Sequence, residues 1–243
     1  LPGGPPQFDN SDEYLTKELD ISLKRLGLDN IDLYYVHRRE EAIPIEEVVE
    51  TLLKFKKAGK INQFGFSEIS PVSLVKANNI HHVAAVQSEY SLSTRFPELG
   101  LLQKTKELET ALVAFSPVGR GLLTDTPPTA ESVINSPFLK TNPRFLEPNR
   151  TANIKAVKNF QNLARDFGLS TAGLAIAWLL TKGDHVIPIP GTRSVKHLKQ
   201  MIKGTEFKLS SEDMKTIEKT LPVGWAHGDR YSTVQWIGPE KYC

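Results

Sequence analysis

Apolar and polar positions alternate in two regular ways along the first part of the chain. Between Leu15 and Leu26 leucine returns every three or four positions, which is the spacing of one helix face. Ser11 stands where an N-cap is expected, and Gly27 stands where a helix ends in a left-handed residue. Residues 31–36 then form a short, mostly apolar run, which is typical of a strand buried on both faces of a parallel sheet. The first predicted unit is therefore a helix followed by a buried strand.

The same alternation continues to about residue 221. Apolar runs predict further strands at residues 61–66, 83–86, 112–115 and 185–189. Helical spacing predicts helices at 44–59, 70–78, 97–108, 153–167, 171–180, 194–202 and 211–221. Two stretches lack any period: a Pro-rich segment, 119–151, and a tail, 222–243. The Pro-rich segment is long, and loops of that length are usually functional or mobile.

Strands that alternate with helices, without a tight hairpin between any two strands, indicate an α/β fold with a parallel sheet. An eight-stranded barrel and an open doubly wound sheet both fit this order. No G-x-G-x-x-G follows any predicted strand, which disfavours the open sheet that binds dinucleotides. The residues at the strand ends, described below, favour the barrel.

The composition limits the class of protein. The chain has 243 residues, 40% of them apolar and 24% charged, which is typical of a soluble globular domain. A net charge of +2 gives no support for binding nucleic acid or a membrane surface. The single cysteine, Cys243, cannot form an internal disulfide, and this favours a reducing, cytoplasmic location. No motif for a metal site is assigned.

Each predicted strand changes from apolar to polar or reactive residues at its carboxyl end. The five ends are His37-Arg38, Ser67-Glu68, Gln87-Ser88-Glu89-Tyr90, residues 116–121 and residues 190–194. In a β/α barrel these ends meet on one face, which carries the active site, although loops are often polar in any fold. At the last end, Arg193 precedes a helix start and suits a phosphate, but Ser194 as an ordinary N-cap explains the same residues equally well.

Together these segments resemble the aldo-keto reductase family. The resemblance covers about residues 11–232 and is carried by residues 26–38, 65–68, 87–91, 115–123, 174–180 and 187–194, which include Tyr35-Val36-His37-Arg38 and Phe115-Ser116-Pro117-Val118-Gly119-Arg120-Gly121. Ser67-Glu68 after the second strand is similar to the fungal and plant branch that includes pyridoxal reductases. The resemblance implies a parallel (β/α)8 TIM-type barrel that reduces an aldehyde or ketone with NADPH.

Carried over position by position, His37 matches the catalytic histidine that orients the substrate carbonyl. Residues matching the cofactor site are Ser67, Glu68, Gln87, Phe115, Ser116, Pro117, Gly119, Arg120, Gly121, Gly191, Thr192, Arg193, Ser194, His197 and Gln200. Ser67 and Gln87 match the nicotinamide carboxamide site, with Glu68 where other branches often have Asn. Phe115 matches the aromatic ring that stacks on the nicotinamide. Of the remaining residues, 116–121 match the pyrophosphate loop, and Arg193-Ser194 match the pair that binds the 2′-phosphate of the adenosine.

Family members also carry three strands before the one at 31–36, and these supply an Asp, a proton-donating Tyr and a Lys. No matching motif is present here, so we expect a single incomplete barrel domain, residues 1–243, that shows strands 4 to 8 and has little activity alone. Its tail, 222–243, is expected to lie over the barrel mouth. The expected partner is a small carbonyl substrate, with the oligomeric state open. Two alternatives remain: an NADPH-binding regulatory subunit similar to potassium-channel β subunits, and an inactive truncated isoform.

Overall fold

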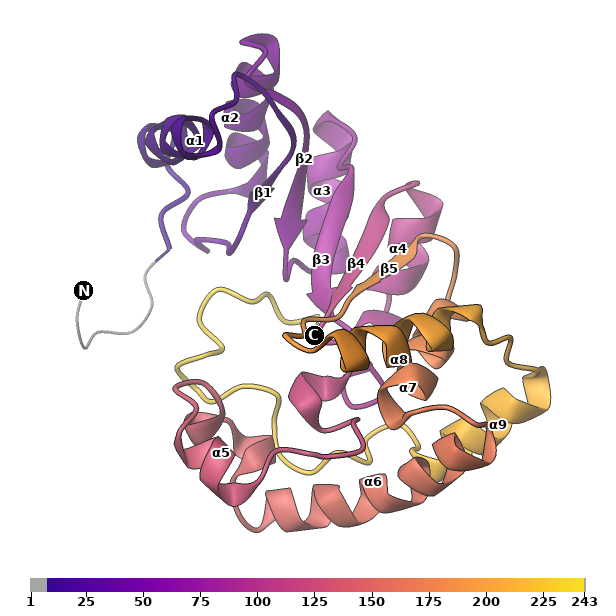
Figure 1. Cartoon of the computed structure of the whole chain (residues 1–243). Helices are drawn as coiled ribbons and strands as arrows, with labels where there is room; N and C mark the ends of the chain where they lie inside the picture. Colours follow the sequence, from indigo (N-terminus) through magenta and orange to yellow (C-terminus); the bar gives the residue numbers. More distant parts are fainter. Residues whose placement is uncertain (1–7, 243) are drawn as a thin grey trace. The chain divides into compact units, whose positions relative to one another are not determined.

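The computed structural model describes residues 8–242 (Figure 1). The chain divides into two compact units, which we describe separately. Unit 1 comprises residues 1–88, 97–113 and 233–243, and unit 2 comprises residues 89–96 and 114–232. The chain passes from one unit to the other within its third and fourth strands, β3 (Ala85–Glu89) and β4 (Ala111–Phe115).

Unit 1 contains the helices and strands predicted for the first part of the chain. They are α1 (Asp12–Leu26), β1 (Ile31–Val36), α2 (Ile45–Lys57), β2 (Ile61–Ser67), α3 (Pro71–Ile80) and α4 (Leu101–Glu107). The caps of α1 are confirmed, because the Ser11 side chain accepts from the Tyr14 backbone N–H and Gly27 adopts φ 67°. Instead of one helix at 97–108, a short 3₁₀ turn at Phe96–Glu98 precedes α4. Gly100, with φ 120°, separates the two, because helical backbone cannot continue through that conformation.

Unit 2 contains α5 (Ala130–Ile134), α6 (Asn149–Asp166), α7 (Thr171–Leu180), β5 (Val186–Ile189), α8 (Val195–Glu206) and α9 (Ser211–Thr220). The Pro-rich segment 119–151 was expected to be a loop without regular structure, and this is wrong. It holds α5, capped by the Thr129 side chain, three short 3₁₀ turns and the first residues of α6. Its prolines begin or separate these short elements, for which proline has a suitable φ.

The strands follow the chain order in one sheet, β1-β2-β3-β4-β5. β1 pairs with β2 and β2 with β3 in parallel, which confirms an α/β fold with a parallel sheet; closure into a barrel stays a prediction. The third strand was predicted at 83–86, but it begins at Ala85 and continues to Glu89. Gln87 therefore lies inside a strand and not just beyond one.

The two faces of the β1–β3 region differ. On one face, Tyr34 packs edge-on against Phe55 of α2 at a ring distance of 6.4 Å, and Phe64 and Phe66 are fully buried. On the other face, Tyr35 lies over Gly65, where an added Cβ would be 2.7 Å from the tyrosine ring. Tyr34, Phe64 and Phe66 thus lie on the face that helices cover, and Tyr35 and Gly65 lie on the opposite face.

Unit 2 is built around α7, whose residues from Leu174 to Leu179 are all buried. The ring of Trp178 meets Tyr90 edge-on at 5.8 Å, and both side chains are fully buried. α8 crosses α7 where Gly204 meets Gly173, and a Cβ on Gly204 would lie 2.2 Å from the Gly173 carbonyl oxygen. This close approach fixes the position of α8, which matters for the site described below.

Among residues 8–242, no single helix combines the length and apolar composition of a membrane span. The consecutive helices α6 and α7 pass that test together, by length and composition only, and are bent by 84° at their junction.

Candidate active site

In unit 1, three predicted site residues lie in one row across neighbouring strands. Val36 is paired with Phe66, and Ser67 is paired with Gln87, so His37, one residue beyond Val36, stands level with Ser67. Alternation along the strands places all three on the face that carries Tyr35 and not on the face covered by helices. The register therefore brings together the predicted catalytic histidine and the two predicted carboxamide-binding residues.

Arg38 hydrogen-bonds to two residues of this row. Sequence reasoning had not assigned it a catalytic or cofactor-binding role. Its Nη1 donates to the carbonyl oxygen of His37 at 2.7 Å and to Ser67 Oγ at 2.9 Å. One guanidinium nitrogen thus links the ends of β1 and β2. The position of a basic residue directly after the histidine at the strand end was the one sequence feature that could have pointed to Arg38.

The ionisation of His37 suits a hydrogen-bond donor to a carbonyl. Burial lowers the pKa of His37 below its usual value, and the nearby Arg38 charge lowers it further. At neutral pH the imidazole is therefore uncharged, with one ring nitrogen that donates and one that accepts.

Glu68 is held in a buried and conformationally costly position. Its φ is 56°, in the left-handed region, and its side chain is 1% exposed. Its backbone N–H donates to the Gln87 carbonyl at 2.8 Å, and its own carbonyl accepts from the Glu240 backbone N–H at 2.8 Å. The carboxylate accepts from Ser88 Oγ at 3.3 Å. Contact of Glu68 with a nicotinamide stays a prediction.

Unit 2 contains a cavity of about 680 Å³, formed by the segment after β4, the Pro-rich segment and the beginning of α8. Nine of the residues predicted to bind the cofactor line it: Phe115, Ser116, Pro117, Arg120, Gly121, Gly191, Thr192, His197 and Gln200. Residues that the sequence had not singled out complete the wall, and they include Thr124, Asp125, Thr126, Pro128, Ser132 and Leu139. The cavity thus gathers segments that are distant in sequence.

Three other predicted cofactor residues of unit 2 are not part of the cavity lining. Gly119 is buried at φ 58°, and a Cβ there would lie 2.7 Å from Ser93 Oγ, so it allows a close approach of the chain. Ser194 is the N-cap of α8, and its Oγ accepts from the His197 backbone N–H at 3.4 Å. Arg193 is exposed, and within the described chain no hydrogen bond or ion pair engages its side chain.

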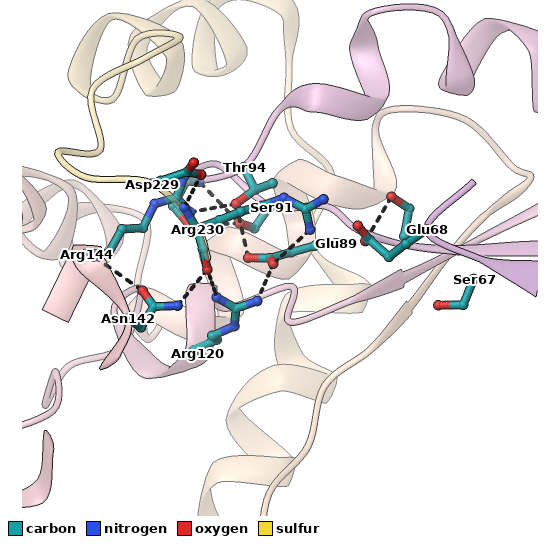
Figure 2. A network of polar contacts seen from close by, with 12 residues as sticks. Ser67, Glu68, Glu89, Ser91, Thr94, Arg120, Asn142, Arg144, Asp229 and Arg230 are labelled. Atoms are coloured by element: carbon teal, nitrogen blue, oxygen red, sulfur yellow. Dashed lines mark hydrogen bonds and ion pairs between the residues drawn. The ribbon is translucent and has the colours of Figure 1, made fainter. Parts of the chain in front are cut away.

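The Arg120 side chain is directed toward Glu89 and not held free for a phosphate (Figure 2). Its Nη2 pairs with Glu89, and its Nη1 donates to the Arg230 carbonyl oxygen at 2.5 Å. The guanidinium also lies against the rings of Phe138 and Tyr231, at 4.6 and 4.7 Å from their centres. The contact between Arg120 and a phosphate that the pyrophosphate loop implies stays a prediction.

Glu89 is the centre of a buried charge cluster (Figure 2). It is 1% exposed and pairs with both Arg120 and Arg230. Arg144 joins through Thr94, to which its Nη1 donates at 2.6 Å, and Thr94 donates to Glu89 at 3.1 Å. Burial lowers the pKa of Arg144 to about 10, which leaves it charged at neutral pH. Arginines outnumber carboxylates here, even with Asp229 included, and this favours an anion in the neighbouring cavity.

Comparison with known proteins agrees with this geometry. The model of the aldo/keto reductase family matches residues 2–222. The chain belongs to the aldo/keto reductase family. It is 36% identical to the aldo-keto reductase yakc [NADP(+)] of Schizosaccharomyces pombe, over 94% of this chain and 68% of that protein. A probable aldo-keto reductase 1 of Glycine max is 38% identical, over 93% of this chain and 65% of its own length.

Solved structures of the same family share the fold. The glycerol dehydrogenase AKR11B4 of Gluconobacter oxydans superposes with a TM-score of 0.76 at 27% identity, over 88% of this chain and 65% of that one. A thermostable aldo-keto reductase gives a TM-score of 0.69 at 28% identity, over 87% and 67%. The chain thus spans about two thirds of the length of these relatives, and membership of this family makes it an oxidoreductase.

Proposed function

We propose that this aldo/keto reductase uses NADPH to reduce an aldehyde or ketone to an alcohol. The observation that carries the proposal is the cavity of unit 2, in which nine residues matching the family's cofactor site come together. The name of the Schizosaccharomyces pombe relative includes NADP(+), which supports the choice of cofactor.

The residues present fit an anionic dinucleotide. The cavity volume of about 680 Å³ lies in the range of small-molecule sites, and hydroxyl, amide and imidazole groups line it. The arginine-rich cluster beside it favours negative charge, and Arg193 stands exposed at the start of α8, where a 2′-phosphate is expected. NADPH, when bound, supplies the hydride. Phe115 and Ser116 would hold its nicotinamide end, and Thr192, His197 and Gln200 its adenosine end.

The row in unit 1 would handle the substrate. Neutral His37 donates a hydrogen bond to the carbonyl oxygen, which polarises the carbonyl and fixes its orientation. Ser67 and Gln87 stand in the same row and offer hydroxyl and amide groups that can hydrogen-bond a polar ligand. Reduction also consumes a proton, which the family takes from a tyrosine that has no matching motif in this chain. We therefore expect turnover by these residues alone to be slow.

Cofactor choice tests the proposal directly. Titration of the chain with NADPH and NADH, followed by nucleotide fluorescence, should show tighter binding of NADPH. Arg193→Ala should weaken NADPH binding by about tenfold or more, because a charge-assisted hydrogen bond is lost, and should leave NADH almost unchanged. Lys196→Ala, which removes another exposed charge of α8, is the matched control. Equal affinities for both nucleotides, or the same loss in both variants, would contradict the proposal.

A further inference from the structure

One edge of the Arg38 guanidinium makes no hydrogen bond or ion pair within the described residues. Its Nη1 carries both of its hydrogen bonds, to the His37 carbonyl oxygen and to Ser67 Oγ. Across residues 8–242, neither Nε nor Nη2 of Arg38 has a hydrogen-bond or ion-pair partner. These two N–H groups share one edge of the planar guanidinium, and together they form the two-pronged donor that matches a carboxylate.

The neighbouring arginine shows what a purely structural guanidinium looks like in this chain. Arg39 is 7% exposed, its Nη2 donates to the Ile43 carbonyl oxygen, and its Nε lies 3.4 Å from a carboxylate oxygen of Glu240. Arg38 also donates to a backbone carbonyl, but it is partly exposed and no carboxylate of the described chain pairs with it. A charge that is fixed in place, partly accessible and without a counter-ion is available to a ligand.

The position of this charge relates it to the substrate. Arg38 is anchored to the backbone of His37 and to the side chain of Ser67, both members of the row described above. Because one nitrogen holds both anchors, the guanidinium is pre-oriented and loses little conformational freedom on binding. A substrate whose carbonyl meets His37 therefore has a fixed cation beside it.

We infer that Arg38 is a specificity-determining residue, and that the substrates of this site are aldehydes or ketones that also carry a carboxylate. The carboxylate would accept from Nε and Nη2 of Arg38 while the carbonyl oxygen accepts from His37. This inference rests on the proposed function, because it adds a substrate class to the same site. It requires no change in the reaction itself.

The first experiment compares substrates of nearly equal shape and different charge. Reduction of 4-carboxybenzaldehyde and of methyl 4-formylbenzoate, its neutral ester, is measured with NADPH, and 3-carboxybenzaldehyde tests the spacing. The wild-type chain should favour an acid over the ester in kcat/KM by about tenfold or more, as expected for a charge-assisted pair. Arg38→Gln should abolish that preference. Arg25→Gln, which removes an exposed charge on α1, should retain it.

The second experiment separates this inference from the proposed function. Binding of the same acids and ester is measured by calorimetry without turnover, with thermal melts to verify folding. Preferential binding of an acid that Arg38→Gln abolishes and Arg38→Lys partly restores supports the inference, even if no aldehyde is reduced and the proposed function fails. Equal binding of acid and ester by the wild-type chain, or a preference unchanged in both Arg38 variants, overturns it, even if the ester is reduced well.

Discussion

The two units build their parts of the site in different ways. In unit 1, strand register alone sets His37 level with Ser67 and Gln87, and one arginine joins two of the strand ends. In unit 2, the cavity depends on segments that are far apart in sequence and held by a buried charge cluster and a helix crossing. This difference predicts that the site residues of unit 1 are affected by substitutions next to them. In unit 2, substitutions outside the cavity lining should lower stability or weaken ligand binding in the cavity.

The largest expected effect comes from Glu89→Gln. This change leaves the shape of the side chain and removes the carboxylate that balances Arg120 and Arg230 in a buried place. Breaking such a pair costs about 3–5 kcal/mol of stability, because the remaining charges are buried without compensation. Urea unfolding followed by circular dichroism measures the loss. Glu212→Gln, at the exposed Glu212–Lys215 pair, should unfold at the wild-type midpoint, and equal midpoints for all three proteins would refute this account.

A smaller effect is expected from Gly204→Ala at the crossing of α7 and α8. The new methyl group would lie 2.2 Å from the Gly173 carbonyl oxygen, so α8 must move away from α7. Overpacking of this kind costs about 1–3 kcal/mol, and the shift would displace His197 and Gln200, so NADPH should bind more weakly. Thr205→Ala, at the exposed neighbouring position, provides the control. Unchanged NADPH affinity in Gly204→Ala would show that the cavity does not depend on this crossing.

The smallest effect belongs to unit 1 and is a dependence on pH. Because the pKa of His37 is lowered in the folded chain, the unfolded chain binds a proton first as the pH falls. The contribution of His37 to stability is therefore complete above its unfolded pKa of about 6.5 and declines as the pH falls through that value. Arg38→Gln should raise the pKa of His37, which NMR titration can follow, with His37→Gln to assign the signal. A pKa that stays the same or falls would contradict the stated effect of Arg38.

Periodicity was sufficient for most of the elements. The leucine spacing of α1 and its caps, Ser11 and Gly27, depend on neighbours in sequence, and the structure reproduces them. The third strand was misplaced because Val83 and Ala84 are as apolar as the strand itself, whereas Gln87, Ser88 and Glu89 are polar residues that the sheet accommodates within it. The Pro-rich segment was misjudged because its short helices are too brief to show a period.

Site residues at the ends of strands could be predicted from the sequence. Side-chain directions that depend on packing between distant segments could not. His37, Ser67 and Phe115 stand at strand ends in the sequence, and the structure keeps them there. The direction of the Arg120 side chain could not be foreseen, because it is set by Glu89 and by the distant Arg230. The sequence could not predict which nitrogens of Arg38 lack a partner in the described chain, because this depends on which nitrogen makes the two hydrogen bonds.

The pairing of Glu89 with Arg230 has a consequence for the order in which the protein is assembled. The two residues are 141 positions apart, so during synthesis the glutamate emerges long before its second partner exists. Contacts of such long range form late, and the buried Arg230 guanidinium is costly until it reaches Glu89, which Arg120 already neutralises. The charge cluster of unit 2 is therefore expected to reach its final form only after residue 230 has been synthesised, so the last step of its assembly belongs to the C-terminal part of the chain.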